Sequence, residues 1–190
     1  MESVKFNTKT ISLVATFAAL TIVLNLSSPV KIPFPLAPYL IYQIWEIPIV
    51  AAFLLYGIAV GTFIATLNTL VLLAVFPGML LTGPFYNFVA VISTLIGIAI
   101  PKIAKYNTQR YSDIKAVAVF TASGIIFRVT IMTLVNWAFL RFPPPVGFNF
   151  PEEAVVASLP VIALFNATLA LYTIPTGYAI VKAIKAIAKA

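Results

Sequence analysis

The stretch GIIFRVTIMTLVNWAFL, residues 124–140, is a continuous apolar run that contains a single charged residue, Arg128. A helix needs about 20 mostly apolar residues to cross the hydrocarbon core of a bilayer, and this run approaches that length. A charged side chain at such a depth is costly and is kept where it has a partner or a function. The stretch therefore predicts a membrane-spanning helix and makes Arg128 the first candidate for a functional residue.

The composition of the whole chain indicates the same surroundings. Of its 190 residues, 62% are hydrophobic and 9% are charged. Soluble domains contain about 45–50% apolar and about 25% charged residues, so a soluble core could not bury this much apolar surface. We therefore expect a multi-pass protein of the plasma membrane, with residues 1–190 forming one integral-membrane domain.

The residue types that are missing exclude several classes of function. The chain has no Cys and no His, which excludes thiol nucleophiles, imidazole bases and the usual zinc sites. It has five acidic residues and no glycine-rich phosphate-binding loop of the GxxxxGK[ST] type. We expect no catalytic residues, no metal site and no cofactor, so any use of ATP must come from a separate subunit.

Six apolar segments, separated by turn-forming sequences, predict an all-α bundle of six transmembrane helices. The first break, SSPVKIPFPLAPY at residues 27–39, contains four prolines and cannot continue a helix. Gly57 predicts a tight turn between the second segment and the third. The expected helices cover residues 10–28, 41–56, 58–76, 84–104, 114–140 and 153–182.

The distribution of basic residues predicts the orientation of the chain. With the N-terminus in the cytoplasm, the inner side carries nine Lys and Arg residues and the outer side carries two, and Arg128 is the twelfth. Cytoplasmic loops are enriched in Lys and Arg, so we expect both termini in the cytoplasm. The positive charge then faces lipid headgroups rather than a nucleic acid. An alternative interpretation makes residues 11–26 a signal peptide, because basic residues precede a short apolar run.

Five polar side chains inside the predicted helices suggest two different roles. Glu46, Asn136 and Asn166 lie toward the predicted outer half of the second, fifth and sixth helices, as a ligand pocket would require. Asn68 and Asn87 are expected to hydrogen-bond neighbouring helices, which is the usual role of a membrane asparagine. The first three are therefore the candidate ligand-binding residues.

Aromatic side chains near the predicted outer openings could form the walls of this pocket. The candidates are Tyr39, Trp45 and Tyr86. The alternative is that they belong to the belt of Trp and Tyr residues found at membrane interfaces.

Arg128 has three possible roles: a ligand contact, a partner for Glu46, or a structural anchor that bonds carbonyls and asparagines inside the bundle. At about 1.5 Å per residue, Arg128 lies near the middle of the membrane, whereas Glu46 is predicted near the outer boundary. This separation argues against a pair with Glu46. We therefore favour the structural role, for which the five N–H donors of a guanidinium are suited.

Small residues form a shallow groove on the first predicted helix. Ser12, Ala15 and Ala19 recur at spacings of three and four residues, with Ala18 beside them. Such a face lets a second helix approach closely, either within the bundle or from a partner. The pattern alone leaves both alternatives open.

Four motifs together resemble a known family. They are WEIP at residues 45–48, GPFYNFVA at 83–90, RVTIMTLVNW at 128–137 and LFN at 164–166. With six helices and a proline-rich first loop, their order is similar to that of the substrate-binding S components of energy-coupling-factor (ECF) vitamin transporters. The riboflavin-specific branch is the most similar, and the likeness extends from about residue 14 to residue 180.

The resemblance implies a vitamin site near the outer face, under the first loop. It implies docking to a transmembrane coupling subunit that is driven by two ATPase subunits, with Ala15 and Ala19 as the docking motif. It also implies ligand contacts from Glu46, Asn136 and Asn166. The chain departs from the riboflavin branch at Leu169, where that branch typically has a lysine.

We therefore expect a high-affinity membrane receptor for riboflavin that feeds an ATP-driven importer and is not an enzyme. One alternative keeps the architecture and changes the ligand to biotin, thiamine, folate or a precursor. A stand-alone small facilitator is a second alternative. A membrane enzyme is a third, but the chain offers few groups for acid–base catalysis.

Overall fold

The computed structural model describes residues 8–76, 82–104 and 113–188, and the statements below concern those residues. They form six helices and one two-stranded hairpin. In chain order the elements are α1 (Thr8–Ser27), β1 (Ile32–Phe34), β2 (Ala37–Tyr42), α2 (Glu46–Tyr56), α3 (Ile58–Val75), α4 (Thr82–Ile103), α5 (Asp113–Phe139) and α6 (Glu152–Ile187).

The helices confirm the expected all-α, multi-pass membrane architecture. In the described part of the chain, five helices are long and apolar enough to cross a bilayer, and α2, with 11 residues, is shorter. At about 1.5 Å per residue, α2 spans only roughly half of the hydrocarbon core. Residues 48–53 of α2 are nevertheless all buried, because α1, α3 and α6 pack around this helix. A helix that is apolar on every side belongs in such an interior.

The hairpin differs from the prediction, which placed a helix from residue 41 to residue 56. Residues 37–42 form β2, which pairs antiparallel with β1 so that Ile32 lies opposite Tyr42. The prolines of this segment exclude a helix and favour extended backbone. Pairing then satisfies backbone groups that would otherwise lack partners in an apolar environment. The second helix consequently begins only at Glu46.

The hairpin is held against α6 by its apolar side chains. Phe34 and Ala37 are buried in a cluster with Phe165 and Leu169 of α6. The rings of Phe34 and Phe165 have their centroids 5.7 Å apart. This packing holds one face of the hairpin against α6, whereas Ile32 and Leu36 are exposed.

Glycine sets the geometry of the turn between α2 and α3. Gly57 has a φ of 92°, a conformation that other residues rarely adopt, and it forms the predicted tight turn. Gly61 lies in α3, where an added Cβ would come within 2.8 Å of the Cβ of Phe53. The absence of a side chain at Gly61 therefore lets α3 pack closely against α2.

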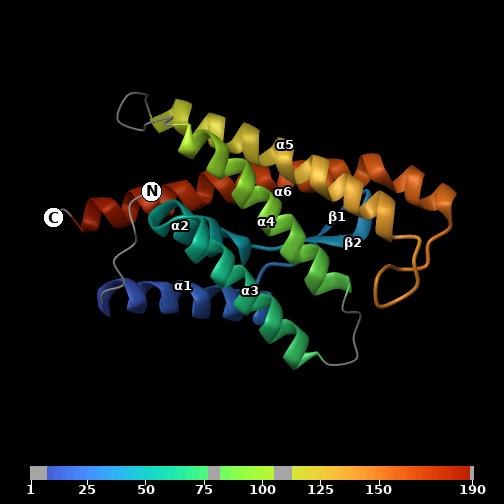
Figure 1. Cartoon of the computed structure of the whole chain (residues 1–190), viewed down its shortest axis with the longest axis horizontal. Helices are drawn as coiled ribbons and strands as arrows, with labels where there is room; N and C mark the ends of the chain where they lie inside the picture. The colour runs from blue at the N-terminus through green and yellow to red at the C-terminus, as the bar shows by residue number, and fades with distance from the viewer. Residues whose placement is uncertain (1–7, 77–81, 105–112, 189–190) are drawn as a thin grey trace.

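Figure 1 shows that the start of α1 and the end of α6 lie at the same end of the bundle, together with the end of α4 and the start of α5. The connection from α5 to α6 lies at the opposite end. Which end faces the cytoplasm remains a prediction from the basic residues.

Candidate ligand-binding site

A cavity of about 110 Å³ lies among α2, α4, α5, α6 and the hairpin. Leu40 and Ile41 of β2 line one part of it, and Phe165 and Leu169 of α6 line another. Polar side chains reach the same cavity from every one of the four helices. They are Glu46 from α2, Tyr86 and Asn87 from α4, Arg128 and Asn136 from α5, and Asn166 from α6.

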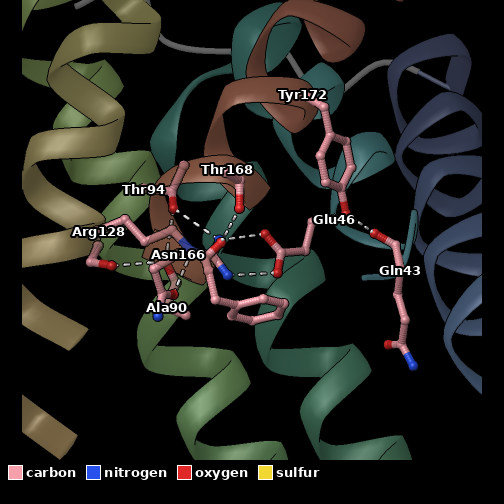
Figure 2. Close-up of polar contacts among 10 residues, drawn as sticks. Gln43, Glu46, Ala90, Thr94, Arg128, Asn166, Thr168 and Tyr172 are labelled. Carbon is pink, nitrogen blue, oxygen red and sulfur yellow. Dashed lines mark hydrogen bonds and ion pairs between the residues drawn. The ribbon is translucent and has the colours of Figure 1, made fainter. Parts of the chain in front are cut away.

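The centre of the site is an ion pair between Arg128 and Glu46 (Figure 2). Nη1 of Arg128 donates to Oε2 of Glu46 at 2.5 Å, and Nη2 donates to Oε1 at 3.0 Å. The two side chains are only 3% and 5% exposed. Two parallel hydrogen bonds of this kind fix the relative orientation of a guanidinium and a carboxylate.

This pair corrects the prediction that the two residues are too far apart. Residues 37–42 form β2 rather than the first turns of a helix, so α2 begins only at Glu46. Glu46 consequently lies buried inside the bundle. The expected bond to an asparagine is present as well, whereas Arg128 donates to no backbone carbonyl among the described residues. Nε of Arg128 donates to Oδ1 of Asn166 at 2.9 Å, and Nη1 donates to the Thr94 hydroxyl at 3.2 Å (Figure 2). Arg128 therefore ties together helices α2, α4 and α6.

The two candidate asparagines differ in how many of their polar atoms are used. Asn166 accepts from Arg128 through Oδ1 and donates through Nδ2 to the Ile162 carbonyl at 2.9 Å. Asn136 donates through Nδ2 to the Met132 carbonyl at 2.6 Å. Its Oδ1 has no hydrogen-bond partner among the described residues. Asn136 thus has an acceptor without a partner in the cavity wall, whereas the acceptor of Asn166 is already bonded to Arg128.

Two of the three candidate aromatic residues reach the cavity. Trp45 and Tyr86 are both buried and line it. The buried hydroxyl of Tyr86 has no hydrogen-bond partner within the described part of the chain. Tyr39 does not line the cavity and is 61% exposed.

Several lining residues were not predicted as site residues, among them Asn87, Gln43 and Leu169. Asn87 was assigned to helix packing, yet it lines the cavity beside Tyr86 and one helical turn from Ala90. Its position next to Tyr86 in the sequence could have indicated that Asn87 also lines the site. Gln43 and Leu169 also line the cavity, but nothing in the periodicity of the sequence marked Gln43. The other assignment to packing is confirmed, since Asn68 accepts a hydrogen bond from Asn25 of α1 at 3.3 Å.

Two tyrosine hydroxyls fasten the hairpin and its connection to α2 onto α6. The hydroxyl groups of Tyr42 and Thr168 lie 2.5 Å apart. The hydroxyl of Tyr172 donates to the Gln43 carbonyl at 2.5 Å (Figure 2). The strand that lines the cavity is therefore bonded to α6 near one of its ends.

The small residues of α1 divide between two faces. Ser12, Ala15 and Ala19 are exposed, whereas Val14 and Ala18 are buried against the bundle. Ala18 therefore does not belong to the groove where it was predicted. The three exposed residues form a narrow outer face of α1, which a helix of another chain could contact.

Comparisons with known proteins find a match at the level of structure. No family model matches the sequence, and no curated protein matches it. Among the solved structures that match is one described as the S component of a bacterial ECF transporter, with a TM-score of 0.72. The two are 20% identical, and the likeness covers 96% of this chain and 98% of that one. The likeness establishes the same fold.

Proposed function

We propose that this chain is the vitamin-binding membrane subunit of an ATP-driven importer of the ECF type, and that riboflavin is its ligand. The observation that carries the proposal is the cavity in which polar groups from four helices meet apolar and aromatic walls. Ligand sites of small molecules combine these features. The fold likeness to an S component over nearly the whole chain supports the same function.

The lining suits the chemistry of a flavin. Trp45, Tyr86 and Phe165 offer aromatic surface on which a flat ring can stack or pack edge to face. Oδ1 of Asn136 accepts from a ring N–H. Glu46 can accept from ribityl hydroxyls while it remains paired with Arg128, because a carboxylate has about four lone-pair positions.

The size of the cavity requires a movement of its walls. Sites for small molecules usually measure about 300–1,000 Å³, and this cavity measures about 110 Å³. The hairpin is the wall that can move with the smallest loss of packing, since each of the other walls is a helix that packs against at least two neighbouring helices. We propose that the hairpin moves away from α6 when the ligand binds and closes over it afterwards.

The exposed small-residue face of α1 is the proposed docking surface for the transmembrane coupling subunit, which in turn carries two ATPase subunits. Ala15 and Ala19 allow the close approach of two helices that such docking requires. The absence of a phosphate-binding loop motif from this sequence fits a partner that supplies the ATP hydrolysis.

A second candidate function keeps the fold and changes the vitamin. Leu169 lines the cavity, and the riboflavin branch typically has a lysine at the corresponding position. An apolar wall at this position favours a less polar ligand, or a flavin bound without that contact.

Titration of purified protein with riboflavin, followed by quenching of flavin fluorescence, tests the proposal. We expect saturable binding of one riboflavin per chain and weaker binding by the Asn136→Ala variant. The matched control is Asn68→Ala, which removes a buried asparagine that hydrogen-bonds outside the cavity. Equal affinities for the parent and the Asn136→Ala variant would place the binding site elsewhere.

A further inference from the structure

We infer that the cavity selects an electrically neutral ligand and that the Glu46–Arg128 pair excludes charged ones. This inference rests on the proposed function as a vitamin receptor and narrows its substrate class. It concerns the charge of the ligand, so it applies to riboflavin and to the alternative vitamins alike.

The charges of the cavity wall cancel. Among the described residues that line it, Glu46 and Arg128 are the charged ones, and they have opposite signs. Both are almost fully buried and bonded to each other through two hydrogen bonds. A charged ligand therefore meets no unpaired countercharge in this part of the protein.

The hydrogen-bonding capacity of the arginine is nearly exhausted. A guanidinium has five N–H donors, and Arg128 makes four hydrogen bonds, two to Glu46 and one each to Asn166 and Thr94. A ligand carboxylate that took the place of Glu46 would leave a buried carboxylate without its partner. A ligand cation that took the place of Arg128 would leave the buried guanidinium without its partner. Breaking a buried pair in this way is strongly unfavourable.

The free polar groups of the wall indicate what the ligand must offer instead. Oδ1 of Asn136 is an acceptor without a partner, and the buried hydroxyl of Tyr86 has none either, within the described residues. Neither group carries a charge. They fit an uncharged molecule with an N–H or O–H for Asn136 and a hydrogen-bonding atom for Tyr86. This chemistry fits riboflavin and argues against biotin and folate, which carry carboxylates, and against cationic thiamine.

The test is a comparison of binding by purified protein of riboflavin and of its 5′-phosphate, which adds negative charge to the same ring. We expect the parent to bind riboflavin at least tenfold more tightly. Glu46→Gln removes the negative member of the pair and leaves Arg128 available to an anion, so the ratio of the two affinities should fall at least tenfold. Steric effects of the phosphate are the same in both proteins, so a change in the ratio of the two affinities measures the effect of charge.

The matched control is Glu152→Gln, which alters an exposed acid outside the cavity that pairs with Arg141 and should leave the ratio unchanged. The parent is also titrated with biotin, folate and thiamine, which keeps the test decisive if Glu46→Gln fails to fold. Tight binding of one of these charged vitamins would overturn the inference and leave the receptor function intact. A parent that binds neither riboflavin nor any of the charged vitamins would contradict the proposed function itself and the inference with it.

Discussion

At the scale of single residues, the central feature is a charge placed inside an apolar bundle. A buried ion pair is a weak source of stability compared with apolar packing, but the loss of one partner leaves the other charge buried and unpaired. Arg128 is therefore needed to pair with the buried carboxylate of Glu46. In turn, Arg128 fixes the position of Glu46 by donating to both of its carboxylate oxygens. The pair links the stability of the bundle to the shape of its cavity.

Arg128→Met is expected to destabilise the protein by about 3–5 kcal/mol, the usual cost of breaking a buried pair. The double variant Arg128→Met with Glu46→Gln should regain part of this loss, because it leaves no unpaired buried charge. Thermal unfolding in detergent measures both. We expect the loss in free energy of unfolding to exceed the loss in free energy of riboflavin binding. An unchanged melting temperature with affinity reduced a hundredfold would instead make Arg128 a ligand contact.

Asn136→Ala and Asn166→Ala should have different effects, although both residues line the cavity. Asn136 has a free acceptor, so we expect its loss to weaken riboflavin binding by about 1–3 kcal/mol with little change in stability. Asn166 is bonded internally at both ends of its amide, so its loss should lower the melting temperature and weaken binding mainly through Arg128. Fluorescence titration and thermal unfolding of both variants separate the two effects. Identical behaviour of the two variants would disprove this division of roles.

At the scale of elements, the hairpin is the part that the sequence did not predict. The prolines of residues 27–39 marked the end of a helix correctly, but a break in the helical pattern carries no information about the structure that replaces it. The hairpin is stabilised by contacts between Phe34 and Phe165, which are far apart in the chain. Local periodicity cannot show such contacts, and the position of Glu46 depends on them.

Tyr172→Phe should increase the rate at which riboflavin dissociates, because it removes the hydrogen bond that ties Gln43 to α6. We expect an increase of about three- to tenfold, which corresponds to a net hydrogen bond of about 0.5–1.5 kcal/mol. Stopped-flow fluorescence measures the rate. Tyr178→Phe is the matched control, since the hydroxyl of Tyr178 bonds Asp113, away from the cavity. Equal dissociation rates for Tyr172→Phe and the parent would show that this bond does not hold the hairpin closed.

At the scale of the whole molecule, the helical architecture followed from the sequence because long apolar runs and their breaks are local signals. Each observed helix lies within two residues of its predicted range, except that α2 starts five residues late and α6 ends five residues late. Part of the polar lining of the cavity was also predicted from the sequence, since the cavity is lined by Glu46, Asn136 and Asn166. Their mutual bonds could not be predicted, because they depend on the depth and rotation of four helices.

Ala15→Trp and Ala19→Trp should each leave riboflavin binding intact and prevent assembly with a coupling subunit. Both alanines are exposed on α1, and a large side chain there would keep a partner helix at a distance. Co-purification with the coupling subunit measures assembly. The control is Ala122→Trp, at an exposed alanine of α5, which should assemble normally. Normal assembly of both α1 variants would remove this face from the proposed interface.

The central claim is that the cavity holds an uncharged vitamin. The most direct test is to denature the protein purified from cells grown in rich medium and to identify the released small molecule by absorbance and mass spectrometry. We predict riboflavin, released in a ratio approaching one per chain and strongly reduced in a parallel preparation of Asn136→Ala. A charged metabolite in its place, or no molecule above the level found with the variant, would contradict the account.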